Sequence, residues 1–567
     1  MSSSLPGPTA STPLLHAQAG PSNLRPQPGS PAVSYSGTLT DPSSSQQRPF
    51  LSPLSRRRRK ASPIVRVVPA AFLLVLFTGF VFIAWNISSV GACYVPWLCR
   101  ILGKGKWRSD EVWWRNTGAY APFRSRGTGG GQINLPRGCV IDQVNVLHRH
   151  AARYPTTGAG QAMQKSLTKL KGRVIKSPRR HPELDFLNKA DLDMTGWRFD
   201  ALMDQGRRAA WRSGKEFAAR YRRLLDKGEG IFSRSSGGDR VVETGQYWML
   251  GLNDEAFKVM STKSLPGVNV TISEEDGFNN TLSVHSCSAY EKLDPPAGRK
   301  EREAVYPLLS STLHRLNDLL RPDPALTYDD LVYLADMCPF DSQREGTEWK
   351  AWSPWCRLFD GYEWEILGYL KDVERYYEVG QGSRYGRTMG AGWVNELIAR
   401  LTDAPVSDST STNRTLDQDE ATFPLGGKRL FVDFSHDNEI IEIMTALNII
   451  PQHRDLPTDK IPRKRSYQLS GLIPFGARLV VERIACDLAN WEPDPNSGED
   501  PDGNGREGDG RKDYVRIFVN DKIYPVDYID CKQSGFVEHD MCEVEAFLAA
   551  QSWATEEVDW GVCYARD

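Results

Sequence analysis

A single apolar segment divides this chain into two unequal parts. From Val67 to Ile87 the sequence runs for 21 residues without a charge, and no charged residue follows Arg66 until Arg100. A helix of this length spans the hydrocarbon core of a bilayer. A secretory signal peptide would be shorter and would lie near the first residue, whereas here a long tail precedes the segment. The sequence therefore predicts a transmembrane signal-anchor helix over residues 67–87.

The flanking charges predict the orientation of that anchor. The basic run Arg56–Lys60 comes directly before it, and the positive-inside rule places the N-terminal side in the cytosol. Residues 1–66 carry eight basic side chains against the single acidic Asp41, which gives this tail a charge of +7 and the remainder −8. Residues 1–55 are rich in Ser, Pro and Gly and are expected to be disordered. The alternative, a buried core helix behind a nuclear-localisation-like basic run, fits the length of the apolar segment less well.

The cysteines agree with a C-terminal part that is lumenal or extracellular. All ten lie beyond the apolar segment: Cys93, Cys99, Cys139, Cys287, Cys338, Cys356, Cys486, Cys531, Cys542 and Cys563. An even set on one side of a membrane predicts disulfides, and no CxxC or Cys/His spacing predicts a structural zinc site. Sequons at Asn269, Asn279 and Asn413 lie on the same side. We therefore expect a single-pass type II glycoprotein of the secretory pathway, at the cell surface or in the vacuole.

The C-terminal part alternates predicted strands and helices, a pattern typical of an α/β domain. β-rich apolar runs predict strands at Val140–Leu147, Leu430–Phe434, Leu479–Ile484 and Tyr514–Val519. Apolar residues at helical spacing from Ile440 to Leu447 predict a helix directly after the second strand. Ala201–Leu225 is predicted to be a long helix with a solvated basic face, and polar composition predicts loops at Asp403–Thr422 and Glu492–Asp513. There is no P-loop or GxGxxG motif, and the acidic balance argues against nucleic acid as a partner.

A polar cluster follows the first predicted strand. Its sequence, from Arg149 to Pro155, is RHAARYP, in which Arg149 and Arg153 bracket His150. Guanidinium groups match phosphate oxygens in a bidentate manner and keep their charge at any relevant pH. A histidine among such cations has a lowered pKa, so that its ring stays neutral and nucleophilic in mild acid. The cluster therefore favours phosphoryl transfer to a histidine nitrogen.

A second polar cluster, Ser435–Asn438, follows the second predicted strand and opens a helix. The N-terminal amides of that helix favour an anion, and His436 is placed to donate to a phosphate oxygen while Asp437 protonates a leaving alkoxide. Arg234, after a short apolar run, is a candidate for a further phosphate contact. Each piece alone has a plain structural explanation, such as helix capping by His436 and Asp437. Their combination at two strand ends is much more specific.

These motifs resemble the histidine acid phosphatases of the fungal phytase-like branch. The family signature RHGxRxP is matched by residues 149–155, and its HD element by His436 and Asp437. Further similar stretches are SRSSGGDRVVETG at 233–245, FNNTLSVHSC at 278–287, YLADMCPFD at 333–341, WVNELIARLT at 393–402, PFGARL at 474–479 and WGVCY at 560–564. The resemblance covers residues 117–564 and does not extend to the tail or the span.

The resemblance implies a fold, a mechanism and a set of site residues. The fold would be a phosphoglycerate-mutase-like α/β domain with a mixed central sheet flanked by helices and a mostly helical cap. His150 would be the nucleophile and Asp437 the proton donor, and no metal or other cofactor would be needed. The phosphate would be held by Arg149, Arg153, Arg234 and His436. The resulting domain prediction is a disordered basic cytosolic tail (1–66), an anchor helix (67–87), a juxtamembrane linker (88–116) and the phosphatase domain (117–567).

One residue departs from the family pattern. The glycine that follows the nucleophile in the signature is Ala151 here, and a turn that needed a positive φ at this position would be strained. The resemblance also implies four disulfides, Cys139–Cys486, Cys287–Cys563, Cys338–Cys356 and Cys531–Cys542, which leaves Cys93–Cys99 as a juxtamembrane pair.

The predicted function is an acid phosphomonoesterase that forms a phosphohistidine intermediate. Phytate hydrolysis is the main alternative substrate class, because a basic stretch from Lys165 to Arg180 could meet a polyanion. A phosphate-binding pseudophosphatase, on account of Ala151, and an interaction protein built on the fold are alternatives from other classes. The complete set of His, Arg and Asp residues weighs against both. The sequence leaves open the natural substrate, the pH optimum, the organelle and the oligomeric state.

Overall fold

The computed structural model describes residues 109–564, except 128–134, 173–180, 227–230, 254–266, 276, 284–285, 345–350, 451, 488–509 and 525–539. All of them belong to one compact unit, Phe82–Asp567. Across these described ranges, no helix has both the length and the apolar character to cross a membrane. The expected tail (1–66), anchor helix (67–87) and Cys93–Cys99 pair lie outside the described residues.

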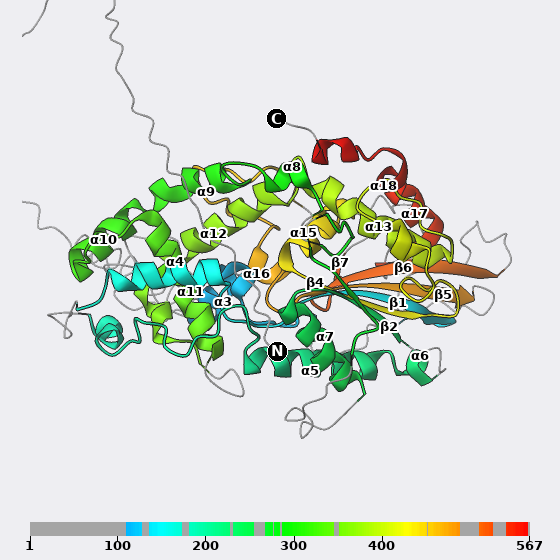
Figure 1. Cartoon of the computed structure of the whole chain (residues 1–567), viewed down its shortest axis with the longest axis horizontal. Coiled ribbons are helices and arrows are strands. Elements are labelled where there is room, and N and C mark those ends of the chain that lie inside the picture. The colour runs from blue at the N-terminus through cyan, green and yellow to red at the C-terminus, as the bar shows by residue number, and fades with distance from the viewer. Residues whose placement is uncertain are drawn as a thin grey trace, which may run out of the picture. The chain divides into compact units, whose positions relative to one another are not determined.

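A mixed sheet forms the centre of the described fold (Figure 1). Its strands are β1 (Cys139–Arg149), β2 (Ile231–Ser236), β3 (Val270–Ile272), β4 (Leu430–Ser435), β5 (Arg478–Asp487), β6 (Arg511–Val519), β7 (Lys522–Tyr524) and β8 (Cys542–Glu543). The order is β3-β2-β4-β1-β5-β6-β7, and β8 pairs with β6. β3, β2, β4 and β1 run parallel, whereas β5, β6 and β7 are antiparallel to their neighbours. The two predicted strands that precede polar clusters, β1 and β4, are therefore adjacent and parallel.

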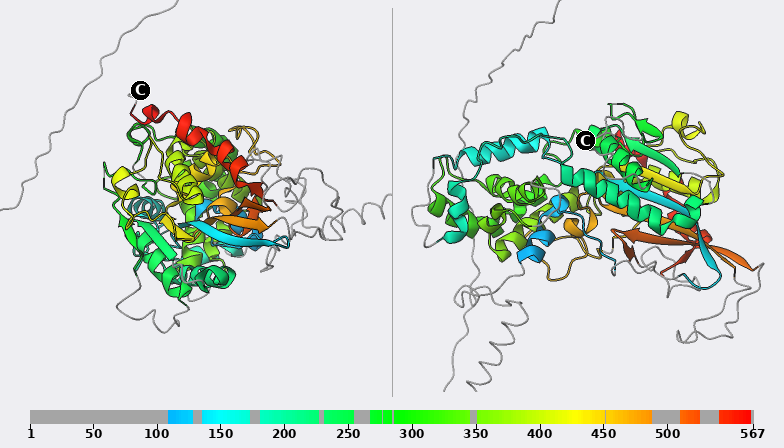
Figure 2. Two further views of the ribbon diagram at one scale, coloured as in Figure 1. Left: turned by 90° about the vertical axis from the view of Figure 1, so that its right-hand side faces the viewer. Right: turned by 90° about the horizontal axis from the view of Figure 1, so that it is seen from below.

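Two long helices cover one face of the sheet. α5 (Asp204–Arg220) and α7 (Asp239–Leu252) pack against each other so closely that a Cβ on Gly214 would lie 1.9 Å from the carbonyl oxygen of Trp248. Phe217 and Trp248 of these helices bury the apolar side chains of β1 and β4. Figure 2 shows α5 running across the sheet in the view from below. The short α6 (Arg222–Asp226) follows α5.

The opposite face carries α13 (Gly386–Thr402) and α15 (Asp437–Ala446). These two helices also approach closely, because a Cβ on Gly390 would lie 2.2 Å from the carbonyl oxygen of Glu442. Near them lie α17 (Val544–Gln551), α18 (Trp553–Glu556) and the 3-10 helix η9 (Trp560–Cys563) (Figure 1). The helix that starts at Asp437 is thus packed along its length and its N-terminus is fixed.

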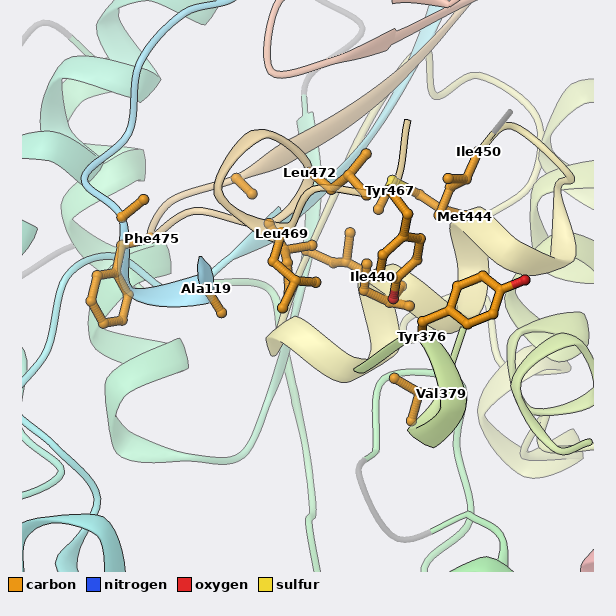
Figure 3. Close-up of a cluster of buried hydrophobic side chains, with 14 of the residues drawn as sticks. Ala119, Tyr376, Val379, Ile440, Met444, Ile450, Tyr467, Leu469, Leu472 and Phe475 are labelled. Atoms are coloured by element: carbon orange, nitrogen blue, oxygen red, sulfur yellow. The ribbon is translucent and has the colours of Figure 1, made fainter. Parts of the chain in front are cut away.

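A largely helical region lies beside the carboxyl ends of β1 and β4 (Figure 1). Its main helices are α4 (Thr157–Thr168), α9 (Arg299–Val305), α10 (Ser310–Leu320), α11 (Tyr328–Arg344) and α12 (Gly361–Glu378). Other short helical elements among the described residues are α3 (Ser109–Asn116), η1 (Gly118–Tyr120), η2 (Pro182–Asn188), α8 (Ser288–Glu291), η4 (Tyr306–Leu309), η5 (Pro354–Leu358), α14 (Arg414–Asp417) and α16 (Leu469–Leu472). One apolar cluster joins this region to α15, as Figure 3 shows for Tyr376, Ile440 and Tyr467. The helical region and the sheet therefore share a core.

The structure refines several sequence predictions. The four predicted strands are present, and Arg511–Asp513, expected in a loop, belongs to β6. Three expected disulfides are confirmed, Cys139–Cys486, Cys287–Cys563 and Cys338–Cys356, while Cys531 lies outside the described residues. Residues 109–116, expected in the linker, form α3, whose Trp114 is part of the shared core. The domain therefore begins before residue 117.

Candidate active site

The sheet brings the two polar clusters together at one edge. Arg149 at the end of β1 pairs in register with Ser435 at the end of β4, so His150 and His436 emerge side by side. Their rings are 5.6 Å apart between centroids in an edge-on arrangement. Both histidines are almost fully buried. Parallel strand ends of this kind are where open α/β sheets place ligands.

Backbone hydrogen bonds fix the turn that carries His150. The His150 amide donates to the Ser435 carbonyl at 2.9 Å, and the His150 carbonyl accepts from the Gly476 amide at 3.0 Å. The Ala151 amide donates to the Thr244 hydroxyl at 3.0 Å, and the Ala152 carbonyl accepts from the Met203 amide at 2.9 Å. With its polar groups paired to four separate segments, the turn is held in place before any ligand binds.

The Ala151 substitution is accommodated without strain. Ala151 is not among the residues with positive φ, so the penalty considered from the sequence does not arise. Its buried side chain lies in a small apolar cluster with Leu202, Ala210, Tyr247 and Leu250. The extra methyl group is therefore packed rather than exposed or crowded.

The hydrogen bonds of His150 define its tautomer. Nδ1 lies 3.0 Å from the Ala151 carbonyl oxygen, which can only accept, so Nδ1 carries the proton and Nε2 carries the lone pair. Burial and the charges of Arg149 and Arg153, with smaller contributions from His436 and Arg240, hold the pKa of His150 well below its ordinary value. The ring is therefore neutral in mild acid, as the sequence predicted.

Arg149 and Arg153 flank this ring with donors to spare. Arg149 is fully buried; it donates through Nη1 to the Ile473 carbonyl at 2.6 Å and through Nη2 to Asp437 at 2.8 Å. Arg153 donates to the Tyr154 carbonyl at 2.9 Å. Both guanidinium groups lie over the Phe475 ring, and the buried Nε of each has no hydrogen-bond partner. These two Nε groups therefore have no protein acceptor and are candidate donors to an anion.

His436 is held between a cation and a carboxylate. Its Nδ1 accepts from Arg240 Nη2 at 3.2 Å, so Nε2 carries the proton and donates to Glu274 at 2.7 Å. Burial opposes the ionisation of Glu274, but the hydrogen bond and charge of His436 and the Ser236 hydroxyl lower its pKa to about 2. Burial is also the main reason why the pKa of His436 is lowered, and Glu274 partly offsets it. Both ring nitrogens of His436 are thus occupied by protein partners.

Asp437 is the first residue of α15 and pairs with Arg149. Although burial alone would raise the pKa of Asp437, Arg149, Arg375, His150 and Arg153 together hold it well below its usual range. The carboxylate is therefore ionised when no substrate is bound. A bound dianion would offset those positive charges and raise this pKa again.

Arg234 does not join the other predicted residues. It lies inside β2, where its Nε, Nη1 and Nη2 atoms all donate to the carboxylates of Asp433 and Glu396 at 2.6–3.1 Å. It is fully buried and aligned in register with Asp433, so it stabilises the sheet interior. The prediction that Arg234 contacts the phosphate is therefore wrong, because its donors already bind Asp433 and Glu396.

The guanidinium that the sequence analysis missed is that of Arg240. It lies in the first turn of α7, which follows β2, and its Nε is buried without a partner. The Arg240 carbonyl accepts from Thr244, whose hydroxyl holds the Ala151 amide. If residues Ile231–Ser236 had been predicted as a strand, Arg240 would have been expected at the site, because polar groups after parallel strand ends converge at the same edge of the sheet.

No metal centre is apparent in the described part of the chain. Among those residues, no group of three or more His, Cys, Asp and Glu side chains is arranged to hold a metal ion. The groups that surround His150 are mainly cations, which favour an anionic ligand rather than a metal.

Comparisons with known proteins identify a family, similar sequences and a similar fold. The model of the histidine phosphatase superfamily (branch 2) matches residues 140–520. Phytase A of Emericella nidulans is 33% identical over 468 residues, which cover 80% of this chain and 90% of that protein. Phytase A of Aspergillus oryzae is 33% identical over 444 residues, covering 76% and 86%. The crystal structure of the phytase from D. castellii has the same fold, with a TM-score of 0.59 and 21% identity over 80% of this chain and 88% of that one. The chain therefore belongs to the histidine phosphatase superfamily, branch 2.

Proposed function

We propose that this chain is an acid phosphomonoesterase that works through a phosphohistidine at His150. The observation that carries this proposal is the group of three arginines, Arg149, Arg153 and Arg240, each with a buried and unpartnered Nε. All three lower the pKa of His150, so they lie close to its ring. Buried donors without partners are costly unless a ligand satisfies them. A phosphate placed over His150 Nε2 would do so and would receive a lone pair aimed at phosphorus.

The first step transfers the phosphoryl group to His150. Nε2 attacks phosphorus, the bond between phosphorus and the ester oxygen breaks, and Asp437 donates a proton to that oxygen, which leaves as an alcohol. The arginines stabilise the charge that spreads over the phosphoryl oxygens. Asp437 starts as a carboxylate, so the proton reaches it only after the substrate dianion has raised its pKa. Substrate binding therefore makes Asp437 able to act as the proton donor.

The second step releases phosphate. Water attacks phosphorus and gives its proton to the Asp437 carboxylate, while the bond between phosphorus and Nε2 breaks and returns the lone pair to His150. Because the Nδ1–H of His150 stays bonded to the Ala151 carbonyl, the ring keeps its orientation through both steps.

His436 and Glu274 also support phosphate binding. When phosphate replaces His436 as the partner of Arg240, His436 Nδ1 becomes free to take up a proton and donate it in a hydrogen bond to a phosphate oxygen. Glu274, already bonded to Nε2, stabilises that imidazolium. We therefore assign phosphate binding to Arg149, Arg153, Arg240 and His436, with Glu274 orienting His436.

Simple phosphate monoesters and phytate are the two substrate classes that this site would accept. The relatives named Phytase A favour phytate. In the basic stretch invoked from the sequence, Lys169 pairs with Asp330 at 2.6 Å and Lys171 with Asp193, and residues 173–180 lie outside the described residues. The pseudophosphatase alternative loses its main argument, because Ala151 does not strain the turn.

Turnover measurements on the full-length chain in mild detergent test the proposal. Nitrophenyl phosphate and phytate should both release phosphate in mild acid, and the ratio of their kcat/KM values assigns the substrate class. His150→Ala should abolish both activities. Hydrolysis that persists in His150→Ala would refute the assigned nucleophile.

We also propose that the chain is a type II membrane glycoprotein with its phosphatase domain lumenal or extracellular. This proposal is supported by the apolar segment 67–87, the basic run before it and three disulfides beyond it. In sealed vesicles, protease should remove only the tail, and glycosidase should reduce the mass of the protected part. Digestion of the phosphatase domain in intact vesicles would contradict this orientation.

A further inference from the structure

His148 lies directly behind the turn that carries the nucleophile. It is the last but one residue of β1, and its buried ring faces α5 rather than the phosphate site. Nδ1 lies 2.6 Å from the carbonyl oxygen of Arg149, and Nε2 lies 3.0 Å from the hydroxyl of Ser213 on α5. His148 is outside the family signature, and the mechanism above does not use it.

In a neutral His148 ring, the carbonyl acceptor defines the hydrogen-bond directions of this network. A carbonyl oxygen can only accept, so the proton of His148 is on Nδ1, and Nε2 must accept from the Ser213 hydroxyl. Ser213 in turn accepts from Arg478 Nη1 at 2.8 Å. Arg478 is held by Asp521 at 2.8 Å and by Glu216 at 3.1 Å. The bond that Ser213 donates to Nε2 therefore requires a neutral His148 ring.

The peptide held by His148 is the one that joins Arg149 to His150. Its carbonyl is fixed by His148 Nδ1, and its amide is fixed by the Ser435 carbonyl. Rotation of this peptide would move both the phosphate-binding guanidinium of Arg149 and the ring of His150. Positioning errors of about 1 Å at a reacting group can cost a hundredfold in rate.

We propose that His148 is a positioning residue for His150, and that it fills this role only in its neutral form. This inference rests on the proposed phosphatase function. Protonation would turn Nε2 into a donor, so the Ser213 O–H would lose its acceptor, and the charged ring would be bonded to a hydroxyl that also accepts from the cationic Arg478. We expect this reversal to displace the ring and the peptide that it holds at the acid end of the working range.

The surroundings of His148 determine the pH at which that displacement begins. Burial and the charge of Arg478 lower the pKa of His148 to about 4, while the bond to Arg149 and the carboxylate of Asp521 oppose this. Glu216 and the exposed Arg212 of α5 line the same cavity of about 540 Å³, and Phe434 of β4 lies 5.7 Å from the ring. Because this cavity reaches His148, protons and water have a route to the ring.

Two substitutions of His148 test the proposal. His148→Asn places an amide N–H where Nδ1–H was but cannot titrate, whereas His148→Phe keeps a ring and removes both bonds. Near pH 5, we expect kcat to fall about tenfold or more in His148→Phe and to be largely rescued in His148→Asn. The dissociation constant for vanadate should rise in His148→Phe, because the guanidinium of Arg149 moves with the peptide, and should change little in His148→Asn. Below pH 4, kcat of the natural protein should fall, and this fall should be absent in His148→Asn.

The outcomes are distinguishable from a failure of the proposed function. Loss of all turnover in the natural protein would refute the phosphatase assignment, whereas the His148 proposal would still be judged by the nitrogen NMR signals of its ring. Those signals should show an Nδ1-protonated ring that titrates near pH 4. A His148→Phe variant with full kcat, or the same acid limb in His148→Asn and the natural protein, would overturn the proposal. If His148→Phe does not fold, the pH profile of His148→Asn and the NMR titration decide it.

Discussion

Two arginines of the same segment, Arg240 and Arg234, should respond to substitution in opposite ways. Arg240→Ala removes a guanidinium whose single direct bond among the described residues is to His436, and whose Nε points to no protein acceptor. Arg234→Met removes a guanidinium that is bonded to two buried carboxylates. The first change should impair catalysis and the second should impair folding.

The contacts give the magnitudes. If Arg240 makes two hydrogen bonds to the phosphoryl group, each worth about 1.5–3 kcal/mol, its loss costs about 3 kcal/mol or more, roughly a hundredfold or more in kcat/KM. Arg234→Met leaves Glu396 buried without a cation, while Asp433 keeps Arg400 and Trp393. Removal of one member of such a buried pair costs about 3–5 kcal/mol of the free energy of unfolding.

The assay compares kcat/KM for nitrophenyl phosphate with the urea midpoint of unfolding in both variants and the natural protein. We expect Arg240→Ala to keep its midpoint and lose activity, and folded Arg234→Met to keep its activity and lose stability. Normal kcat/KM in Arg240→Ala would show that the phosphate is held elsewhere. A catalytic loss in Arg234→Met with an unchanged midpoint would show that Arg234 acts in the active site after all.

Three further predictions concern the acid, the buried carboxyls and the turn. Asp437→Asn should be severely slowed on alkyl phosphates and only mildly on nitrophenyl phosphate, whose leaving group needs little protonation; equal slowing in steady-state assays of both would contradict the acid role. Burial and the nearby Glu378 raise the pKa of Glu442 to about 8, so the folded state retains a proton that the unfolded chain releases, and stability should fall as pH rises from the ordinary glutamate range towards 8. Thermal unfolding should therefore show Glu442→Gln to be stabilising near pH 8 and neutral near pH 4; a gain of the same size at both would refute the linkage. Ala151→Gly should change kcat by less than about twofold while lowering stability by about 1 kcal/mol, and a large gain in kcat would show that the natural turn is strained after all.

The sequence predicted the site wherever a strand led directly into a polar cluster. β1 and β4 are buried along most of their length, and their last residues pair in register, so His150 and His436 converge. The same pattern predicted that the adjacent arginines would lower the pKa of His150, whereas burial, the larger cause, comes from tertiary packing.

Prediction failed where local sequence could not reveal an ion-pair partner. Arg234 and Arg240 lie six residues apart in a polar stretch, and only the pairing of β2 with β4 shows that Arg234 faces Asp433 inside the sheet. Glu274 and His148 were missed for the same reason. Their partners, His436 and Ser213, are distant in sequence and are brought near by tertiary packing.

Rapid quenching of a turnover reaction tests the central claim most directly. The full-length chain is mixed with labelled nitrophenyl phosphate, quenched in alkali to preserve a phosphoramidate, digested and analysed by mass spectrometry. We predict an acid-labile phosphoryl group on His150, formed within the first turnover and absent in His150→Ala. A phosphoryl group on another residue, or turnover by His150→Ala, would contradict the account.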